Sequence, residues 1–143
     1  MIDNSVDCVE CMAASDNVVR AGLTPKFKDV DTLVGMLTYT QKSVIDQILC
    51  GQRFKDSHYT LVFDPPIEEF TVLKTELKSG EMEVFKGFKG PSVLIVTGGS
   101  GFINADKVFN TELGSAYFLS ADQIMTIESG TDGMVVYIAY CEL

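Results

Sequence analysis

The sequence predicts a mainly-β protein: an antiparallel jelly-roll β-sandwich with a short helical segment before it. From residue 58 onward, apolar residues alternate with a period of two, and glycine or proline recurs about every 8–12 residues. This region contains no stretch of helical periodicity between its strands. Short strands joined by turns, without helices between them, indicate antiparallel pairing.

The helical segment is predicted at residues 29–50, where apolar residues recur at spacings of three and four. Asp29 or Asp31 could cap its first turn, because a short carboxylate accepts the free amide hydrogens there. Gly35 weakens the case for one continuous helix. We therefore expect two short helices that are separated near residues 39–42 and packed outside the sandwich.

The strands are bounded by turn residues, beginning with the stop at Asp64-Pro65-Pro66 and including the pair Gly98-Gly99 and, before the last strand, Gly130. A strand that enters a glycine turn, a second strand, and then residues 114–119 form an order typical of small jelly rolls of the cupin type. The strands expected are residues 58–63, 70–75, 81–85, 92–97, 101–103, 108–111, 116–119, 123–128 and 134–140.

Composition and charge exclude several classes of protein. The net charge of −9, from 20 acidic and 11 basic residues, argues against binding to nucleic acid. No apolar run approaches the roughly 20 residues that span a bilayer, so no membrane contact is expected. The first residues lack a basic region followed by an apolar stretch, so no signal peptide is visible. A cytoplasmic, reducing location is the simplest reading of four scattered cysteines, Cys8, Cys11, Cys50 and Cys141.

Three short motifs have plain structural explanations. Cys8 and Cys11 form a C-x-x-C match, but no second pair follows at zinc-site spacing, so two small apolar side chains in a strand are expected. Residues 98–101 lack the lysine and helix of a phosphate-binding loop, which favours a hairpin turn. His58 has the only imidazole of the chain and is expected to be half-buried at a strand end.

A denser group of polar residues lies in residues 15–27. It combines Asp16, Arg20 and Lys26 with a glycine and a proline that imply a sharply shaped backbone. A capped turn with solvent-facing charges explains the composition as well as a functional loop does. The residue types alone leave these two interpretations even.

A resemblance favours the functional interpretation. Residues 10–27, ECMAASDNVVRAGLTPKF, closely resemble the catalytic-arginine segment of type I phosphomannose isomerases, and Asp64-Pro65-Pro66 and Phe70 continue the likeness more loosely. The resemblance implies three parts: residues 1–28, the catalytic-arginine segment at the tail of a preceding cupin domain; residues 29–57, a helical linker; and residues 58–143, a C-terminal cupin-like sandwich without its own metal site.

The same resemblance implies an activity. Enzymes of this family interconvert mannose 6-phosphate and fructose 6-phosphate through an enediol-like intermediate, with one zinc ion bound by histidine, glutamate and glutamine. Arg20 matches the catalytic arginine, and Lys26 matches an active-site lysine and could contact substrate oxygens or phosphate. Asp16 and Glu10 match acidic positions near the substrate, where either could orient Arg20, and Asp16 is a candidate for proton transfer.

The chain departs from the family pattern in its metal ligands, because residues 1–9 contain no histidine and all four expected ligands are absent. We therefore expect zinc in the complete family enzyme, none bound by this chain alone, and an N-terminal catalytic half as partner. The alternatives are a non-catalytic cupin-like module that binds a sugar phosphate or a partner, and a structural domain that completes an isomerase in trans.

Overall fold

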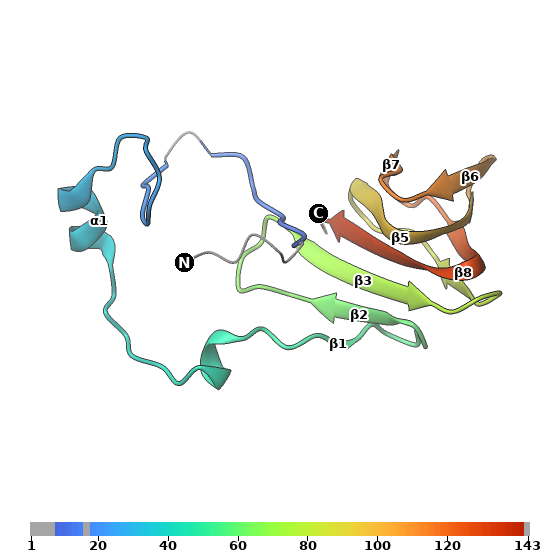
Figure 1. Cartoon of the computed structure of the whole chain (residues 1–143), viewed down its shortest axis with the longest axis horizontal. Helices are drawn as coiled ribbons and strands as arrows, with labels where there is room; N and C mark the ends of the chain where they lie inside the picture. Colours follow the sequence, from blue (N-terminus) through green and yellow to red (C-terminus); the bar gives the residue numbers. More distant parts are fainter. Residues whose placement is uncertain (1–7, 16–17, 142–143) are drawn as a thin grey trace. The chain divides into compact units, whose positions relative to one another are not determined.

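The computed structural model describes residues 8–15 and 18–141. They divide into two compact units. One unit contains residues 8–11 and 49–141, and the other contains the described residues between 12 and 48. The first is a β-sheet, and the second holds the short helices (Figure 1).

The helical unit contains two short helices, as the periodicity predicts. Helix α1 spans Val30–Met36, and a single 3₁₀ turn, η1, spans Ile45–Gln47. Asp29, and not Asp31, is the N-cap: its carboxylate accepts hydrogen bonds from the Thr32 amide at 3.1 Å and the Thr32 hydroxyl at 2.8 Å. These two bonds lower the pKa of Asp29. Within the described ranges, no helix is long and apolar enough to cross a bilayer.

The other unit is a sheet of eight strands whose pairings are all antiparallel, which confirms the predicted mainly-β, antiparallel class (Figure 1). The strands are β1 (Gln52–Arg53), β2 (Thr60–Phe63), β3 (Thr71–Leu77), β4 (Met82–Phe85), β5 (Ser92–Asn104), β6 (Val108–Glu112), β7 (Ala116–Leu119) and β8 (Met125–Tyr140).

The two long strands, β5 and β8, run through both halves of the sheet. One half contains β1, β2, β3 and β7, and the other half contains β4 and β6. The strand order is β1-β2-β3-β8-β5-β6, with β4 beside β8 and β7 beside β5. Strand β8 pairs with β3 through residues 134–140 and with β4 through residues 125–128. Strand β5 pairs with β7 through residues 92–95 and with β6 through residues 100–104.

The core lies on one face of these strands, because burial alternates along β3, β5 and β8. Aromatic and aliphatic side chains from both halves meet there. The buried apolar residues are Leu73, Leu77, Phe85, Phe88, Leu94, Val96, Ile103, Leu119, Met125, Ile127, Met134, Val136, Ile138 and Tyr140.

The predicted hairpin turn at residues 98–101 is wrong, since β5 continues through it. The pairing with β8 instead shifts register on both sides of Gly99. Gly99 has a φ of +67°, and a Cβ there would lie 2.0 Å from the Gly133 carbonyl oxygen. A Cβ on Gly101 would lie 2.1 Å from the Glu128 carbonyl oxygen. The glycines therefore permit a bulge and a close approach to β8.

The predicted boundary at Gly130 is also wrong, because residues 123–128 and 134–140 belong to one strand, β8. Residues 130–133 lie between the pairs Gly101–Ser129 and Gly99–Met134, so they bulge opposite the irregular part of β5. The glycine marks an irregularity in a continuous ladder and not a reversal of the chain.

Candidate functional site

The loop that carries Arg20 runs directly into α1. The chain turns at Gly22, whose carbonyl oxygen accepts a hydrogen bond from Lys28 Nζ at 3.1 Å. The Lys26 amide donates to Thr24 Oγ1 at 3.3 Å. The Asp29 cap then starts the helix. Local hydrogen bonds thus shape this loop, as its glycine and proline predict.

The four residues predicted from the sequence are distributed over both units, and one of them lies outside the described residues. Arg20 is half-buried and Lys26 is exposed, and both belong to the helical unit. Glu10 is exposed and belongs to the sheet unit. Asp16 lies outside the described residues. The roles of all four therefore stay predictions, with Arg20 and Lys26 on one loop.

The segment around Glu10 borders the sheet. Val9 and Cys11 line an apolar groove of about 390 Å³ together with sheet residues that include Val72 and Tyr137. Partial burial raises the pKa of the Cys11 thiol. Cys8 and Cys11 are free thiols in irregular chain, so the predicted strand is wrong here.

No metal cluster occurs among the residues that the structure describes: none of their His, Cys, Asp and Glu side chains form a group of three or more that could hold an ion. His58 is exposed, and its ring meets the Tyr59 ring edge-on at 6.2 Å. The prediction that His58 is half-buried is wrong, because the histidine lies in the exposed connection between β1 and β2, and β2 begins only at Thr60.

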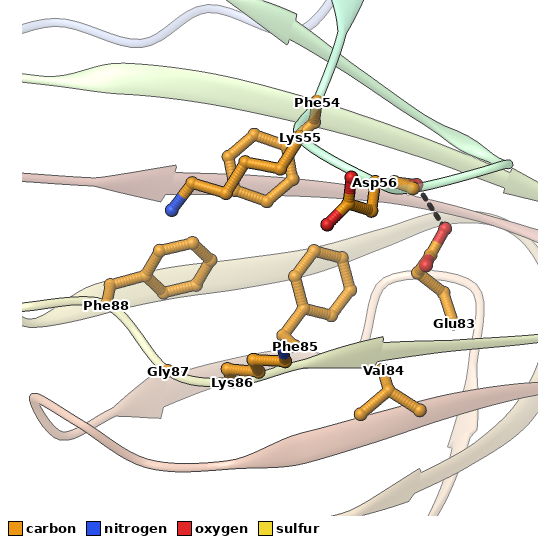
Figure 2. Close-up of a pocket in the computed structure, with 10 residues that line it drawn as sticks. Phe54, Lys55, Asp56, Glu83, Val84, Phe85, Lys86, Gly87 and Phe88 are labelled. Atoms are coloured by element: carbon orange, nitrogen blue, oxygen red, sulfur yellow. Dashed lines mark hydrogen bonds between the residues drawn. The ribbon is translucent and has the colours of Figure 1, made fainter.

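A polar cluster that the sequence analysis missed surrounds Glu83 (Figure 2). Glu83 Oε2 accepts hydrogen bonds from the Ser57 hydroxyl, the Tyr59 amide at 3.2 Å and the Thr60 hydroxyl at 3.4 Å. It borders a cavity of about 190 Å³. The signal in the sequence is a polar turn, Lys55-Asp56-Ser57, but nothing there reveals that it pairs with a glutamate 26 residues away.

The known proteins similar to this chain include phosphomannose isomerases, also named mannose-6-phosphate isomerases. A family model described as "Phosphomannose isomerase type I C-terminal" matches residues 60–107. A Schizosaccharomyces pombe protein named mannose-6-phosphate isomerase is 46% identical over 144 residues, which cover 97% of this chain. A Saccharomyces cerevisiae protein of the same name is 44% identical over 144 residues, which cover 96%.

The chain is homologous to the C-terminal part of type I phosphomannose isomerases. It spans about a third of the length of these curated relatives, 35% of the first and 33% of the second. The resemblance carried by the motif around Arg20 is thereby confirmed.

Solved phosphomannose isomerases have the same fold. A Salmonella typhimurium mannose 6-phosphate isomerase, described as bound to its substrate, fructose 6-phosphate, and to zinc, matches with a TM-score of 0.73 and 24% identity, over 92% of this chain and 32% of that one. Another, described as the zinc-bound holo form, matches with a TM-score of 0.70 and 23% identity, over 90% of this chain and 31% of that one.

The zinc of those phosphomannose isomerases does not fit the residues described here. A zinc site needs three or four nitrogen, sulfur or oxygen ligands that converge on one point. The described residues offer one exposed histidine and no converging group.

Proposed function

We propose that this chain is the C-terminal part of a zinc-dependent aldose–ketose isomerase that interconverts mannose 6-phosphate and fructose 6-phosphate through an enediol intermediate. One observation carries the proposal: 46% identity, over nearly the whole chain, to a protein named for this activity. The motif at residues 10–27 supplies charged groups suited to such chemistry.

Arg20 is the proposed catalytic residue. Its guanidinium stays protonated and presents a planar fork of donors, so it can stabilise the negative charge on an enediolate without taking part in proton transfer. The proposed role of Lys26 is contact with phosphate or sugar oxygens. Glu10 or Asp16 would orient the guanidinium, and Asp16 remains the candidate proton carrier.

The proposed partner is the N-terminal part that the curated relatives possess, which would also supply the zinc ligands. The helical unit supports this choice, because α1 has seven residues and none of them is buried. Leu23 is 91% exposed and Phe27 80% exposed on the Arg20 loop. A helix this short is unstable in water without packing, so these apolar side chains need a covering surface.

The outer face of the sheet also presents apolar side chains that need a covering surface. Five apolar side chains form a row across five strands, each directly opposite the next: Phe63, Val72, Ala139, Val93 and Phe118. Val93 is 53% exposed and Phe118 71% exposed. A contiguous apolar row on a sheet marks an interaction surface, and we assign it to the same N-terminal part.

The cupin-type jelly-roll connectivity and the division at residues 28 and 57 belong to this proposal. So does a cytoplasmic location. The described cysteines are all free thiols, which agrees with a reducing compartment.

The rival function is a non-catalytic cupin-like module that binds a sugar phosphate or a partner. The lack of a metal cluster among the described residues favours it for the chain in isolation. It predicts that adding the N-terminal part restores no turnover.

One experiment separates these functions. The N-terminal part of the S. pombe relative, ending where its alignment with this chain begins, is fused to residues 1–143. Isomerisation of mannose 6-phosphate is then assayed with zinc for the chain alone, for the fusion, and for a mixture of the two parts. We expect turnover by the fusion and none by the chain alone. A well-folded, zinc-loaded fusion without turnover would refute the isomerase proposal, and turnover by the mixture would identify complementation in trans.

A further inference from the structure

Lys28 closes the loop that carries Arg20 and Lys26. Its Nζ reaches back over six residues and donates a hydrogen bond to the Gly22 carbonyl oxygen at 3.1 Å. The other hydrogen bond inside this loop joins Lys26 to Thr24, two residues apart. Among the described residues of the loop, the Lys28 bond is therefore the one that ties its beginning to its end.

Packing does not hold the loop in place of that bond. Leu23 and Phe27 are almost fully exposed, so the apolar side chains of the loop contribute little to its shape. Gly22 turns the chain with a φ of +72°. Bringing the two ends of a flexible loop together costs conformational entropy, and a hydrogen bond between those ends offsets part of the cost.

The surroundings of Lys28 offer no other explanation for its ammonium. Lys28 directly precedes Asp29, the N-cap of α1, and a cation beside the positive end of a helix dipole is unfavourable. The Asp29 carboxylate is already engaged by Thr32. Within the described ranges, Lys28 forms no ion pair, and its ammonium donates to a neutral carbonyl instead.

The two lysines of the loop therefore have different tasks. The side chain of Lys26 has no partner among the residues that the structure describes, so its ammonium is available to an anion. The ammonium of Lys28 is occupied by the Gly22 carbonyl. We propose that Lys28 is a positioning residue, which fixes the turn two residues after Arg20 and thereby presents the guanidinium. This inference rests on the proposed isomerase function.

The first test measures turnover by the zinc-loaded fusion with the N-terminal part. Lys28→Met keeps the apolar stem and removes the donor, so it should lower kcat by about 3- to 10-fold, as expected for the loss of one ordinary hydrogen bond. Lys28→Arg supplies a donor again and should restore most of that loss. Lys42→Met removes an exposed lysine of the helical unit outside the loop and should leave kcat unchanged.

A double-mutant cycle separates positioning from direct contact with the substrate. Because Lys28 acts through Arg20, Lys28→Met should lower kcat by less than about twofold in a fusion that already carries Arg20→Ala. A loss of the same size in both backgrounds would overturn the proposal. A raised KM with unchanged kcat would also overturn it, since that result indicates a direct contact between Lys28 and the substrate.

Backbone dynamics give a readout that does not depend on turnover. In the isotope-labelled fusion, amide order parameters of residues 22–28 should lie near the roughly 0.85 of rigid backbone and fall below about 0.6 in Lys28→Met, with recovery in Lys28→Arg. Unchanged order in Lys28→Met, or unchanged kcat despite lost order, would contradict the positioning role. A folded, zinc-loaded fusion without turnover would refute the isomerase function instead, and the order parameters would still decide whether Lys28 holds the loop.

Discussion

Arg20 provides the sharpest test at the scale of single residues. In the fusion with the N-terminal part, Arg20→Ala should lower kcat by about 100- to 1000-fold, because the lost guanidinium acts on charge that develops only in the transition state. Arg20→Lys should restore little, since an ammonium cannot reproduce the planar fork. Steady-state kinetics would measure kcat and KM separately.

Arg53 is the matched control for that substitution, because it is the other arginine of the chain and is exposed on β1. Arg53→Ala should leave kcat and KM close to those of the unmodified fusion. Circular dichroism should show that all variants are folded. A fusion carrying Arg20→Ala with near-normal turnover would contradict the proposed role and the mechanism built on it.

Asp29 provides a test that depends on pH. Its pKa is lowered in the folded chain by hydrogen bonds from Thr32, so the carboxylate stabilises the start of α1 above the unfolded value of about 3.9. That stabilisation should disappear as the pH falls through the lowered folded pKa. The Thr32 amide should then exchange faster with solvent, as measured by NMR.

Asp29→Asn should keep an acceptor at the cap but remove this pH dependence. Asp31→Asn is the control, because Asp31 lies in the first turn but does not accept the cap hydrogen bond. Thr32 exchange that follows the same pH profile in Asp29→Asn as in the unmodified chain would rule out Asp29 as the titrating group.

At the scale of elements, the irregular stretch of β5 predicts a large difference between two glycine substitutions. Gly101→Ala places a Cβ 2.1 Å from a backbone oxygen of β8 and should destabilise the fold by about 3 kcal/mol. Gly114→Ala has a φ of +87° but open space around it, so it should cost only about 1 kcal/mol. Urea unfolding would measure both; equal costs would show that close approach is not what requires glycine at 101.

The glycine positions also show the limit of what the sequence predicts about the strands and turns. Alternation predicted β7 at residues 116–119, where the structure has it, and predicted most other strands to within a few residues. It placed turns at Gly98-Gly99 and Gly130, where β5 and β8 bulge instead. A glycine signals an unusual backbone, but whether the chain reverses there depends on a partner strand far away in the sequence.

The residues of the candidate site also differ in how far the sequence predicts them. The composition of residues 15–27 and their resemblance to a family single out Arg20 and Lys26, because these charged residues lie within one short segment of the sequence. The Asp29 cap is equally local, with its partner three residues away. The turn at Lys55 and its anchor Glu83 meet only through folding, so no local pattern could connect them.

At the scale of the whole molecule, the main prediction concerns zinc. The chain alone, washed with a chelator, should retain no stoichiometric zinc, and added zinc should not raise its melting temperature, since a metal that binds the native state stabilises it. The fusion should retain about one equivalent and lose activity on chelation. Metal analysis and thermal melts would check both. Tight zinc binding by the isolated chain would contradict the proposed origin of the ligands.

The sharing of β5 and β8 between both halves of the sheet has a consequence for folding cooperativity. Neither half can open without disturbing the strands that complete the other half. Separate subglobal unfolding steps are therefore disfavoured, and the most protected amides of both halves should exchange through the same global opening. The pairing of β5 with β8 also joins residues far apart in the chain, which favours slow formation of this ladder in folding.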